Sequence, residues 1–315
     1  MTHIGIVIRN FREKMGLSRI ELAQQICSEK YLYLIETGKR SPSSHILYLF
    51  GEKLHEDLFI YYRYLDCKDP ISVCQFISKF NLCRQKGDYI TLKEFNAKAK
   101  DLADFKKDPW KIQIFMNEIS IQIFLERKYE NCIEKISKYL SNTSSYPEKS
   151  KTKTRLYILL SICYTMIGNS TKAHEATMEA ASLLPESSVI YQDQTHIAAH
   201  INLLTSYYLI KNYEDACRKG TSLIRYMSDF GFYDRLLIPY FFTAFAYYHI
   251  SDFENAFFYF TKGIHFSLAN FNPLDVYDVS VQDMFFLMLH DSRMNAALVK
   301  EFLEEYGTYI SQEQE

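Results

Sequence analysis

The feature that most constrains the fold is a short polar break that recurs from residue 71 onward, each time between a long apolar segment and a shorter one. The breaks are Gly87-Asp88-Tyr89, Arg127-Lys128-Tyr129, Gly168-Asn169-Ser170, Lys211-Asn212-Tyr213 and Ser251-Asp252-Phe253. Their third residues lie 40, 41, 43 and 40 positions apart. After three breaks an alanine follows three residues on, at Ala173, Ala216 and Ala256, where a small side chain lets two helices approach closely. This regularity predicts a stack of helix pairs.

The pattern resembles the tetratricopeptide (TPR) repeat, whose period is about 34 residues. We predict that the extra residues lengthen the helices or the joins. The predicted units are 71–101, 109–141, 149–184, 188–229 and 234–269, followed by a terminal helix pair over 273–307. Because glycine and proline are few, ten and seven in 315 residues, helices are favoured over loop-rich β structure. We therefore expect an all-α chain with a TPR-like solenoid over 71–310.

A second feature lies near the N-terminus, where Leu17 to Ser43 predicts two short helices with a tight turn between them. Ser18 is a good N-cap, and Glu21 three residues later completes a capping box. We expect the inner face of this helix to carry Ile20, Leu22, Ala23 and Ile26. Such a pair of helices suits insertion of the second one into a major groove of DNA.

The second short helix is predicted to begin after Ser28 and to bury Leu32 and Ile35. Thr37-Gly38 ends it, and a basic loop with Lys39 and Arg40 follows. Three flanking helices are expected at His3–Met15, after the cap Ser43, and over Asp57–Leu65. A linker over 66–70 comes next, because Pro70 disfavours helical backbone at Asp69. The predicted organisation is thus a five-helix domain over 1–65, the linker, and the solenoid.

The residues Leu17-Ser18, Leu22-Ala23, Ile35-Glu36, Gly38-Lys39 and Pro42-Ser43 resemble the phage-repressor-like (Cro/C1, or XRE) helix-turn-helix family. The usual family has one more residue between Leu17 and Glu36. This shorter spacing, joined to the repeats, is similar to the PlcR- and Rgg-type peptide-pheromone receptors of Gram-positive bacteria, the RRNPP group. The resemblance implies that Arg12 pairs with Glu36 and ties the first helix to the recognition helix.

The same resemblance implies a set of DNA contacts. Glu29, Lys30 and Leu34 would face base edges, although an Arg or Gln is common in the family at the position of Leu34. Phosphate or sugar contacts would come from the flanking positions. The full predicted set is Ser18, Arg19, Glu29, Lys30, Tyr31, Tyr33, Leu34, Lys39, Arg40 and Ser43. The alternative is that the domain is a repurposed fold that serves protein contacts.

Aligning each break on the TPR pattern places eight side chains on the concave side of the first helices. They are Arg84, Gln113, Asn117, Arg155, Thr205, Tyr208, Phe245 and Tyr248. Asn and Gln amides can bond a peptide backbone, and Arg can take a carboxylate in bidentate fashion. For each residue alone, packing between repeats is the competing interpretation.

Charge and cysteine content bound the class of protein. The formal net charge is −2, yet residues 1–65 hold nine Lys/Arg against seven Asp/Glu, so the basic excess lies with the helix-turn-helix motif. This small excess favours DNA binding as a dimer, with phosphate contacts from two copies. Seven scattered cysteines without a C-x-x-C motif favour reduced thiols in a cytoplasmic protein. We expect no signal peptide and no membrane segment.

No cofactor is predicted, because nucleotide-binding loops are absent. His196 and His200 share a helix face, but no third metal ligand is evident, so packing or peptide contact is expected instead of a metal. No catalytic grouping stands out, and we expect no enzyme.

We expect a transcription regulator that binds palindromic operator DNA as a homodimer and receives a short signalling peptide in its TPR domain, as in quorum sensing. Two alternatives stay open. One is a TPR adaptor that binds another protein. The other is a ligand-independent repressor whose groove is filled by its own C-terminal helices through Phe285, Phe286 and Leu289.

Overall fold

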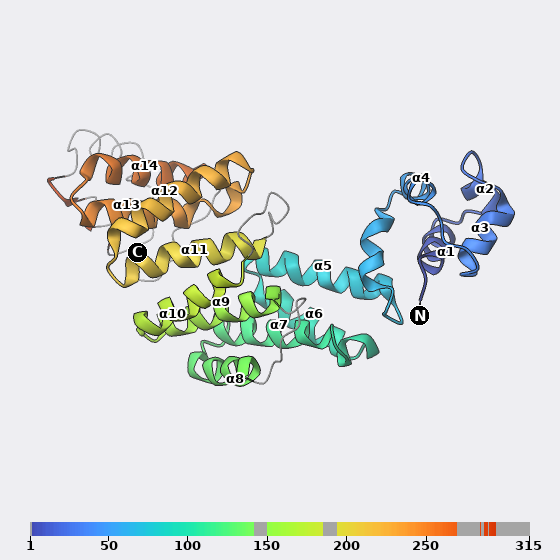
Figure 1. The fold of residues 1–315 in the computed structure, drawn as a ribbon, viewed down its shortest axis with the longest axis horizontal. Coiled ribbons are helices and arrows are strands. Elements are labelled where there is room, and N and C mark those ends of the chain that lie inside the picture. Colours follow the sequence, from blue (N-terminus) through green and yellow to red (C-terminus); the bar gives the residue numbers. More distant parts are fainter. Residues whose placement is uncertain are drawn as a thin grey trace. The chain divides into compact units, whose positions relative to one another are not determined.

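The computed structural model describes residues 2–141, 150–184, 194–269, 284, 287–288 and 290–293. Every regular element within these residues is helical, which confirms the predicted all-α class (Figure 1). The chain divides into two compact units, Met1–Lys128 and Tyr129–Glu315. No helix of the described residues is both long and apolar enough to cross a membrane. All seven cysteines are free thiols, and all but Cys27 are buried.

The first unit begins with four helices. They are α1 (Ile4–Lys14), α2 (Arg19–Ala23), α3 (Glu29–Glu36) and α4 (Ser44–Leu54). The predicted caps are confirmed: the hydroxyls of Ser18, Ser28 and Ser43 each accept a backbone N–H three residues on. Ser18 and Glu21 form the full capping box. Each cap satisfies one of the N–H groups that a helix start leaves unpaired.

The inner face predicted for α2 is wrong at Ile20, whose side chain is 65% exposed, whereas Leu22 and Ala23 are buried. Residues two apart point to opposite sides of a helix, so Ile20 and Leu22 cannot share a face. The helix also ends after only five residues, before Gln25 adopts a φ of 65°. A partly buried Ile26 then packs on the core from the turn rather than from the helix.

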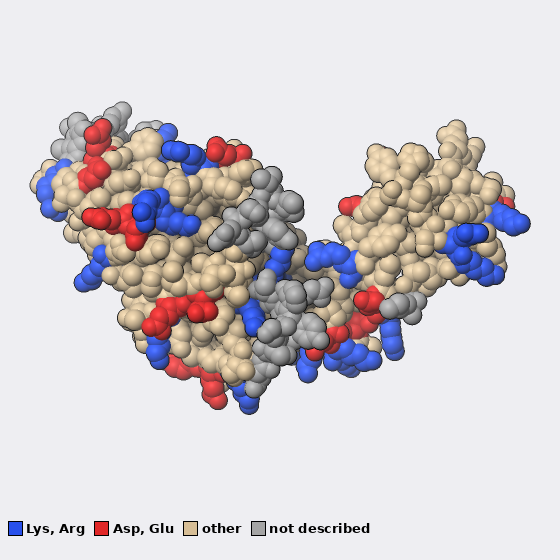
Figure 2. All heavy atoms as spheres, viewed as in Figure 1, with Lys and Arg blue, Asp and Glu red and all other residues tan. Residues whose placement is uncertain are grey.

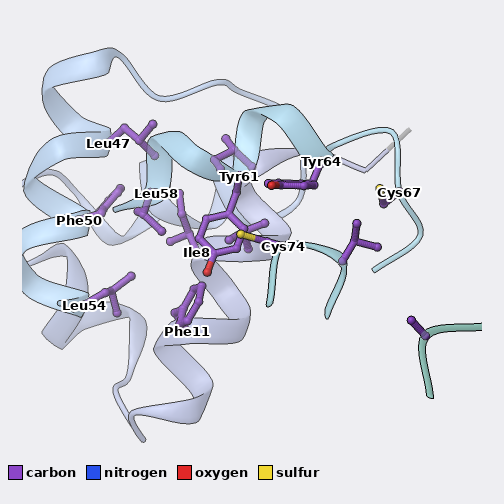
Figure 3. Close-up of a cluster of buried hydrophobic side chains, with 14 of the residues drawn as sticks. Ile8, Phe11, Leu47, Phe50, Leu54, Leu58, Tyr61, Tyr64, Cys67 and Cys74 are labelled. Atoms are coloured by element: carbon purple, nitrogen blue, oxygen red, sulfur yellow. The ribbon is translucent and has the colours of Figure 1, made fainter. Parts of the chain in front are cut away.

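The predicted fifth helix is a 3₁₀-helix, η1 (Leu58–Tyr64), capped by Asp57. Its buried residues are Leu58, Tyr61 and Tyr64, three positions apart, which is the spacing that a 3₁₀-helix aligns on one face. Tyr61 packs edge-on against Phe11 of α1. Figure 3 shows these side chains with Ile8, Leu47, Phe50 and Leu54, so η1 closes the core of the first four helices.

The rest of the first unit comprises α5 (Pro70–Lys86), α6 (Tyr89–Lys100), η2 (Ala103–Lys106) and α7 (Lys111–Phe124). Asp69 has non-helical backbone and caps α5, as expected before Pro70. Trp110, at the start of α7, stacks on Tyr64 with ring centroids 5.0 Å apart. One continuous apolar core therefore joins the first four helices to α5–α7. The division into a domain over 1–65, a linker over 66–70 and a repeat domain over 71–310 stays a prediction.

The second unit contains α8 (Tyr129–Ser141), α9 (Ser150–Met166), α10 (Ser170–Ser182), α11 (Gln194–Leu209), α12 (Tyr213–Asp229), a short η4 (Tyr233–Arg235), α13 (Leu237–His249) and α14 (Phe253–Ala269). All five predicted breaks are turns between helices. The first residue of each break has a positive φ, at Gly87, Arg127, Gly168, Lys211 and Ser251. This left-handed residue ends one helix and turns the chain into the next.

Close packing explains the small residues after the breaks. Ala173, Ala216 and Ala256 are buried, as predicted. Gly220 on α12 packs even more tightly, because a Cβ there would lie 1.9 Å from Oγ1 of Thr243 on α13. The terminal pair predicted over 273–307 lies mostly outside the described residues.

Candidate nucleic-acid interface and peptide-binding face

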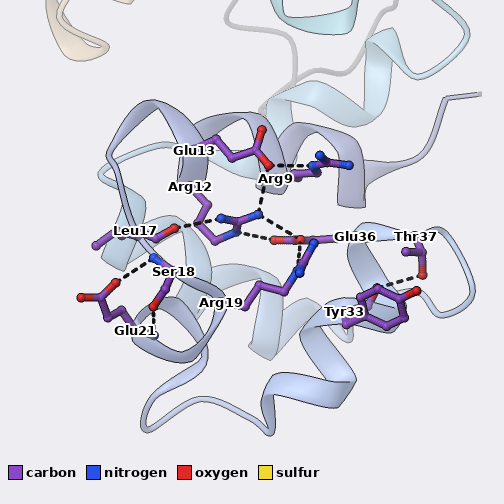
Figure 4. Close-up of polar contacts among 10 residues, drawn as sticks. All are labelled: Arg9, Arg12, Glu13, Leu17, Ser18, Arg19, Glu21, Tyr33, Glu36 and Thr37. Atoms are coloured by element: carbon purple, nitrogen blue, oxygen red, sulfur yellow. Dashed lines mark hydrogen bonds and ion pairs between the residues drawn. The ribbon is translucent and has the colours of Figure 1, made fainter.

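A buried charged cluster fixes α3. Arg12 on α1 donates from Nε to Oε1 of Glu36 at 2.6 Å and from Nη2 to Oε2 at 3.1 Å (Figure 4). The implied Arg12–Glu36 pair is thus confirmed. This hydrogen bonding raises the pKa of Arg12. Arg12 Nη1 also donates to the backbone carbonyl of Leu17 at 2.8 Å, so one guanidinium holds α1, α3 and the chain before α2 together.

Arg19 joins the same carboxylate from the other side. Its Nε donates to Oε2 of Glu36 at 2.7 Å, and its guanidinium lies 5.4 Å from the ring centroid of Tyr33. Glu36 therefore holds two guanidinium groups with a side chain that is 1% exposed.

The exposed residues on and after α3 form the outward surface of this domain. Glu29, Lys30, Tyr33, Lys39 and Arg40 are exposed. Among the described residues, no ion pair involves Glu29 or Lys30 at the start of α3. The same is true of Lys39 and Arg40, which follow the helix. Figure 2 shows blue side chains gathered at the edge of the domain where α3 lies, beside a broad uncharged face. Exposed cationic side chains at the start of α3 and in the loop after it suit contact with a phosphate backbone.

The remaining predicted DNA residues are partly engaged. The hydroxyls of Ser18 and Ser43 serve as helix caps. Tyr31 is half-buried, and its hydroxyl donates to the backbone carbonyl of Ser41 at 3.3 Å, which fixes the basic loop against α3. Leu34 is half-buried. Hydrogen bonding therefore distinguishes Ser18, Tyr31 and Ser43, which shape the turn and the loop, from the exposed charged residues around α3.

Two residues that sequence reasoning missed position this surface. Gly5 on α1 packs against α3, since a Cβ there would lie 1.8 Å from the carbonyl oxygen of Ile35. Lys53 on α4 donates from Nζ to the carbonyls of Glu21 and Gln24, at the end of α2. Both contacts join segments about 30 residues apart, so no local pattern reveals them.

On the first helices of the repeats, several predicted ligand residues bond to other polar side chains of the protein. In the first unit, Arg84 on α5 donates to Oδ1 of Asn117 on α7 at 3.0 Å. Asn117 in turn donates to Oδ1 of Asn96 at 3.0 Å. Asn117 is fully buried, so it offers no surface to a peptide in this conformation. Gln113, earlier on α7, is half-buried.

The same arrangement recurs in the second unit. Arg155 on α9 donates from Nε to Oγ1 of Thr195 on α11 at 2.8 Å. Oη of Tyr208 on α11 lies 3.3 Å from Nε2 of His249 on α13. The partners are 40 and 41 positions apart, close to the spacing of the breaks. Polar side chains therefore link successive first helices, α9 to α11 and α11 to α13.

The last three predicted ligand residues differ in exposure. Thr205 is half-buried, and its hydroxyl donates to the carbonyl of Asn202 at 2.9 Å. Phe245 is buried in the core of α13 and α14, so it too offers no surface to a peptide. Tyr248 is buried, and its hydroxyl donates to Oδ2 of Asp291.

His196 and His200 lie on one face of α11, with their Nε2 atoms 3.0 Å apart. Burial, together with the positive charge of Lys219, lowers the pKa of His200 to about 3. Among the described residues no group of three His, Cys, Asp or Glu side chains is placed to hold a metal ion.

Comparison with known proteins places the N-terminal segment. Residues 8–58 match the family model described as Helix-turn-helix (HTH_3). The N-terminal segment is a helix-turn-helix domain. No curated protein sequence matches the chain.

Two solved structures extend the likeness beyond the helix-turn-helix domain. PlcR of Bacillus thuringiensis, solved with the peptide PapR7 and DNA, is 15% identical, with a TM-score of 0.65 over 92% of this chain and 100% of that chain. ComR from S. thermophilus, solved with DNA and its signalling peptide ComS, is 16% identical, with a TM-score of 0.53 over 90% of this chain and 99% of that chain. The chain shares their fold, which confirms the predicted resemblance at that level.

Proposed function

We propose that the protein is a transcription regulator that binds operator DNA through its helix-turn-helix domain and is controlled by a short signalling peptide bound by its TPR-like repeats. The observation that carries the DNA-binding part is the exposed surface of Glu29, Lys30, Lys39 and Arg40 around α3. The cluster around Glu36 holds this surface rigidly. PlcR and ComR, which share the fold, were both solved with DNA and a peptide.

The proposed site assigns base readout to Glu29, Lys30 and Leu34 and phosphate contact to Lys39 and Arg40. Lysine can donate to guanine, glutamate can accept from cytosine N4, and leucine can meet a thymine methyl. Ser18, Arg19, Tyr31, Tyr33 and Ser43 surround these positions. A homodimer would place two copies of α3 on half-sites about one helical turn, or a multiple of it, apart.

Peptide control would work as a population shift. A peptide bound across the first helices would favour one curvature of the repeats and change the separation of two helix-turn-helix domains in the dimer. A peptide without preference between curvatures would have no effect. Arg84, Gln113, Arg155, Thr205 and Tyr208 keep partial exposure for such contact.

A ligand-independent repressor is the second candidate, and one observation favours it. Met284 and Met288 near the C-terminus pack with Phe241, Phe245 and Phe260. Arg293 donates from Nη2 to the hydroxyl of Tyr248 at 2.9 Å, next to the bond between Tyr248 and Asp291. C-terminal residues therefore already cover Tyr248, one of the predicted peptide contacts. Phe285, Phe286 and Leu289, the residues expected to fill the groove, lie outside the described residues.

A double substitution tests DNA binding. Lys30→Ala with Arg40→Ala should abolish protection of operator DNA in a nuclease footprint while leaving helical circular dichroism and the dimer unchanged. Arg218→Ala with Lys262→Ala removes the same charges from exposed positions in the second unit and is the matched control. Full protection by the Lys30/Arg40 variant would refute the placement of the recognition helix. No protection by the wild type at low salt would favour an adaptor.

Calorimetry separates the receptor from the ligand-independent repressor. The probes are synthetic fragments of 5–10 residues from the C-terminus of any short reading frame beside the gene. Saturable binding near one peptide per protomer supports the receptor. If the wild type binds no fragment but Met288→Ala with Asp291→Asn does, the C-terminal residues occupy the site and the ligand-independent repressor is favoured.

A further inference from the structure

The strongest unassigned feature is the assembly of Arg19, Glu36 and Tyr33. Arg19 is the first residue of α2, and Tyr33 lies in the middle of α3. The Arg19 side chain spans the turn between them, with Nε on Glu36 and its guanidinium over the Tyr33 ring. Its side chain is 33% exposed and Tyr33 is 44% exposed, so the assembly reaches the surface.

The charge balance leaves a positive charge available at this assembly. Arg9, Arg12 and Arg19 face only the carboxylates of Glu13 and Glu36. Arg12 makes two hydrogen bonds to Glu36, so that carboxylate is already neutralised from the buried side. The guanidinium of Arg19 is therefore held by Glu36 without losing its attraction for an anion or an acceptor pair.

The hydrogen bonding also leaves the right donors. Nε of Arg19 donates to Glu36. Within the described residues the two Nη groups of Arg19 have no hydrogen-bond partner. These two groups form a planar fork that fits two acceptors at once, such as O6 and N7 of guanine or two oxygens of a phosphate. A fork fixed by a carboxylate and an aromatic ring loses less conformational entropy on binding than a free side chain.

The position favours a base edge over a phosphate. Tyr33 shares the exposed stripe of α3 with Lys30 and Thr37, because residues three and seven apart lie on one side of a helix. Arg19 stacks on that stripe. A side chain that lies along the exposed stripe of the recognition helix enters the major groove with it.

We infer that Arg19, held by Glu36 and Tyr33, reads one guanine in each half-site of the operator through its two Nη groups. This inference rests on the proposed function, because it requires that α3 lies in the major groove. Glu36 and Tyr33 are positioning residues. Arg19 thereby supplies the arginine–guanine contact that is missing at Leu34.

The test is selection of binding sequences from a random duplex DNA pool by the purified full chain. Wild type should enrich a motif with one guanine in each half-site that is preferred at least about tenfold over other bases. Arg19→Gln should lose that preference and keep the rest of the motif, whereas Arg19→Lys should keep only part of it, since lysine can donate to guanine but lacks the planar fork. Tyr33→Phe keeps the ring and should keep the guanine, whereas Tyr33→Ala should weaken it.

Three outcomes would overturn the inference. One is an unchanged motif with Arg19→Gln. Another is a uniform loss of affinity for all DNA sequences, with about one fewer counterion released on binding. That result would identify Arg19 as a phosphate contact. The third is loss of all binding by Arg19→Lys with unchanged thermal unfolding. If the wild type itself enriches no sequence, the proposed function fails instead, so the two failures are distinguishable.

Discussion

The helix-turn-helix domain and the repeats of the second unit use polar side chains differently. The domain concentrates them in one charged cluster in which Glu36 holds Arg12 and Arg19. The second unit distributes neutral or singly charged pairs along its first helices, such as Arg155 with Thr195 and Tyr208 with His249. A buried ion cluster is costly to break, whereas a neutral pair exchanges partners at small cost. The first arrangement suits a rigid reading surface, and the second suits a scaffold that a ligand can adjust.

The largest effect should come from breaking the charged cluster. Glu36→Ala leaves the buried Arg12 without its carboxylate and should lower the free energy of unfolding of the first unit by about 3–5 kcal/mol. Trp110 is the only tryptophan and stacks on Tyr64 in this unit, so its fluorescence reports urea unfolding there. Lys100→Ala is the control, because the exposed Lys100–Glu118 pair should contribute below about 1 kcal/mol. Equal losses of unfolding free energy in the two variants would show that the buried cluster is no more costly to break than an exposed ion pair.

The second effect concerns pH and the second unit. The folded pKa of His200 is about 3, against an ordinary value of 6.5, so the unfolded chain binds this proton more readily. The stability that neutral His200 gives is complete above pH 6.5 and declines as pH falls below it. The free energy of unfolding should fall by about 1 kcal/mol for each pH unit between 6.5 and 5.

Urea unfolding followed by circular dichroism at pH 7.5, 6.5 and 5.5 measures this loss. His200→Gln should flatten the pH dependence, and the difference from wild type removes the contribution of His249, whose pKa burial also lowers. A variant with the same slope as wild type would show that His200 titrates normally in the fold.

A smaller gain is expected at Thr243 on α13. Its hydroxyl is buried and has no hydrogen-bond partner in the described residues. Thr243→Val keeps the shape, removes the unpaired group, and should raise the free energy of unfolding by about 1 kcal/mol. Thr177→Val on α10 is the matched control, since the buried Thr177 hydroxyl donates to the carbonyl of Ala173 at 2.9 Å. That variant should be neutral or destabilised, and a gain at both sites would mean that the missing bond is irrelevant.

Local chemistry explains which parts were predictable from sequence. The caps Ser18, Ser28 and Ser43 bond to N–H groups three residues away, so their role is readable from a short segment. The helix breaks are readable for the same reason. Arg12 and Glu36 are 24 positions apart, and only the family resemblance paired them.

The predicted ligand face was harder to read, because a polar residue on a first helix has the same sequence pattern whether it faces a peptide or the next repeat. Asn117 was expected to bond a peptide backbone, yet its partners are Arg84 and Asn96. Phe245 was expected to form a pocket, yet it belongs to the core. Ile20 was misplaced because it lies two positions from Leu22 and therefore on the opposite side of α2.

The smallest stability effect should give the clearest test of the ligand face. Tyr208→Phe removes only the hydroxyl beside His249, a neutral contact of 3.3 Å near the surface, so the free energy of unfolding should change by about 0.5 kcal/mol or less. Burial raises the pKa of Tyr208 to about 12, so the hydroxyl is neutral at working pH and no charge is lost. Any large fall in peptide affinity, measured by calorimetry, would then come from a lost contact with the peptide rather than from unfolding. Tyr213→Phe is the control, because Tyr213 stacks on the same His249 and is outside the predicted set. If both variants bind the peptide as wild type does, the Tyr208 hydroxyl links repeats and does not contact the ligand.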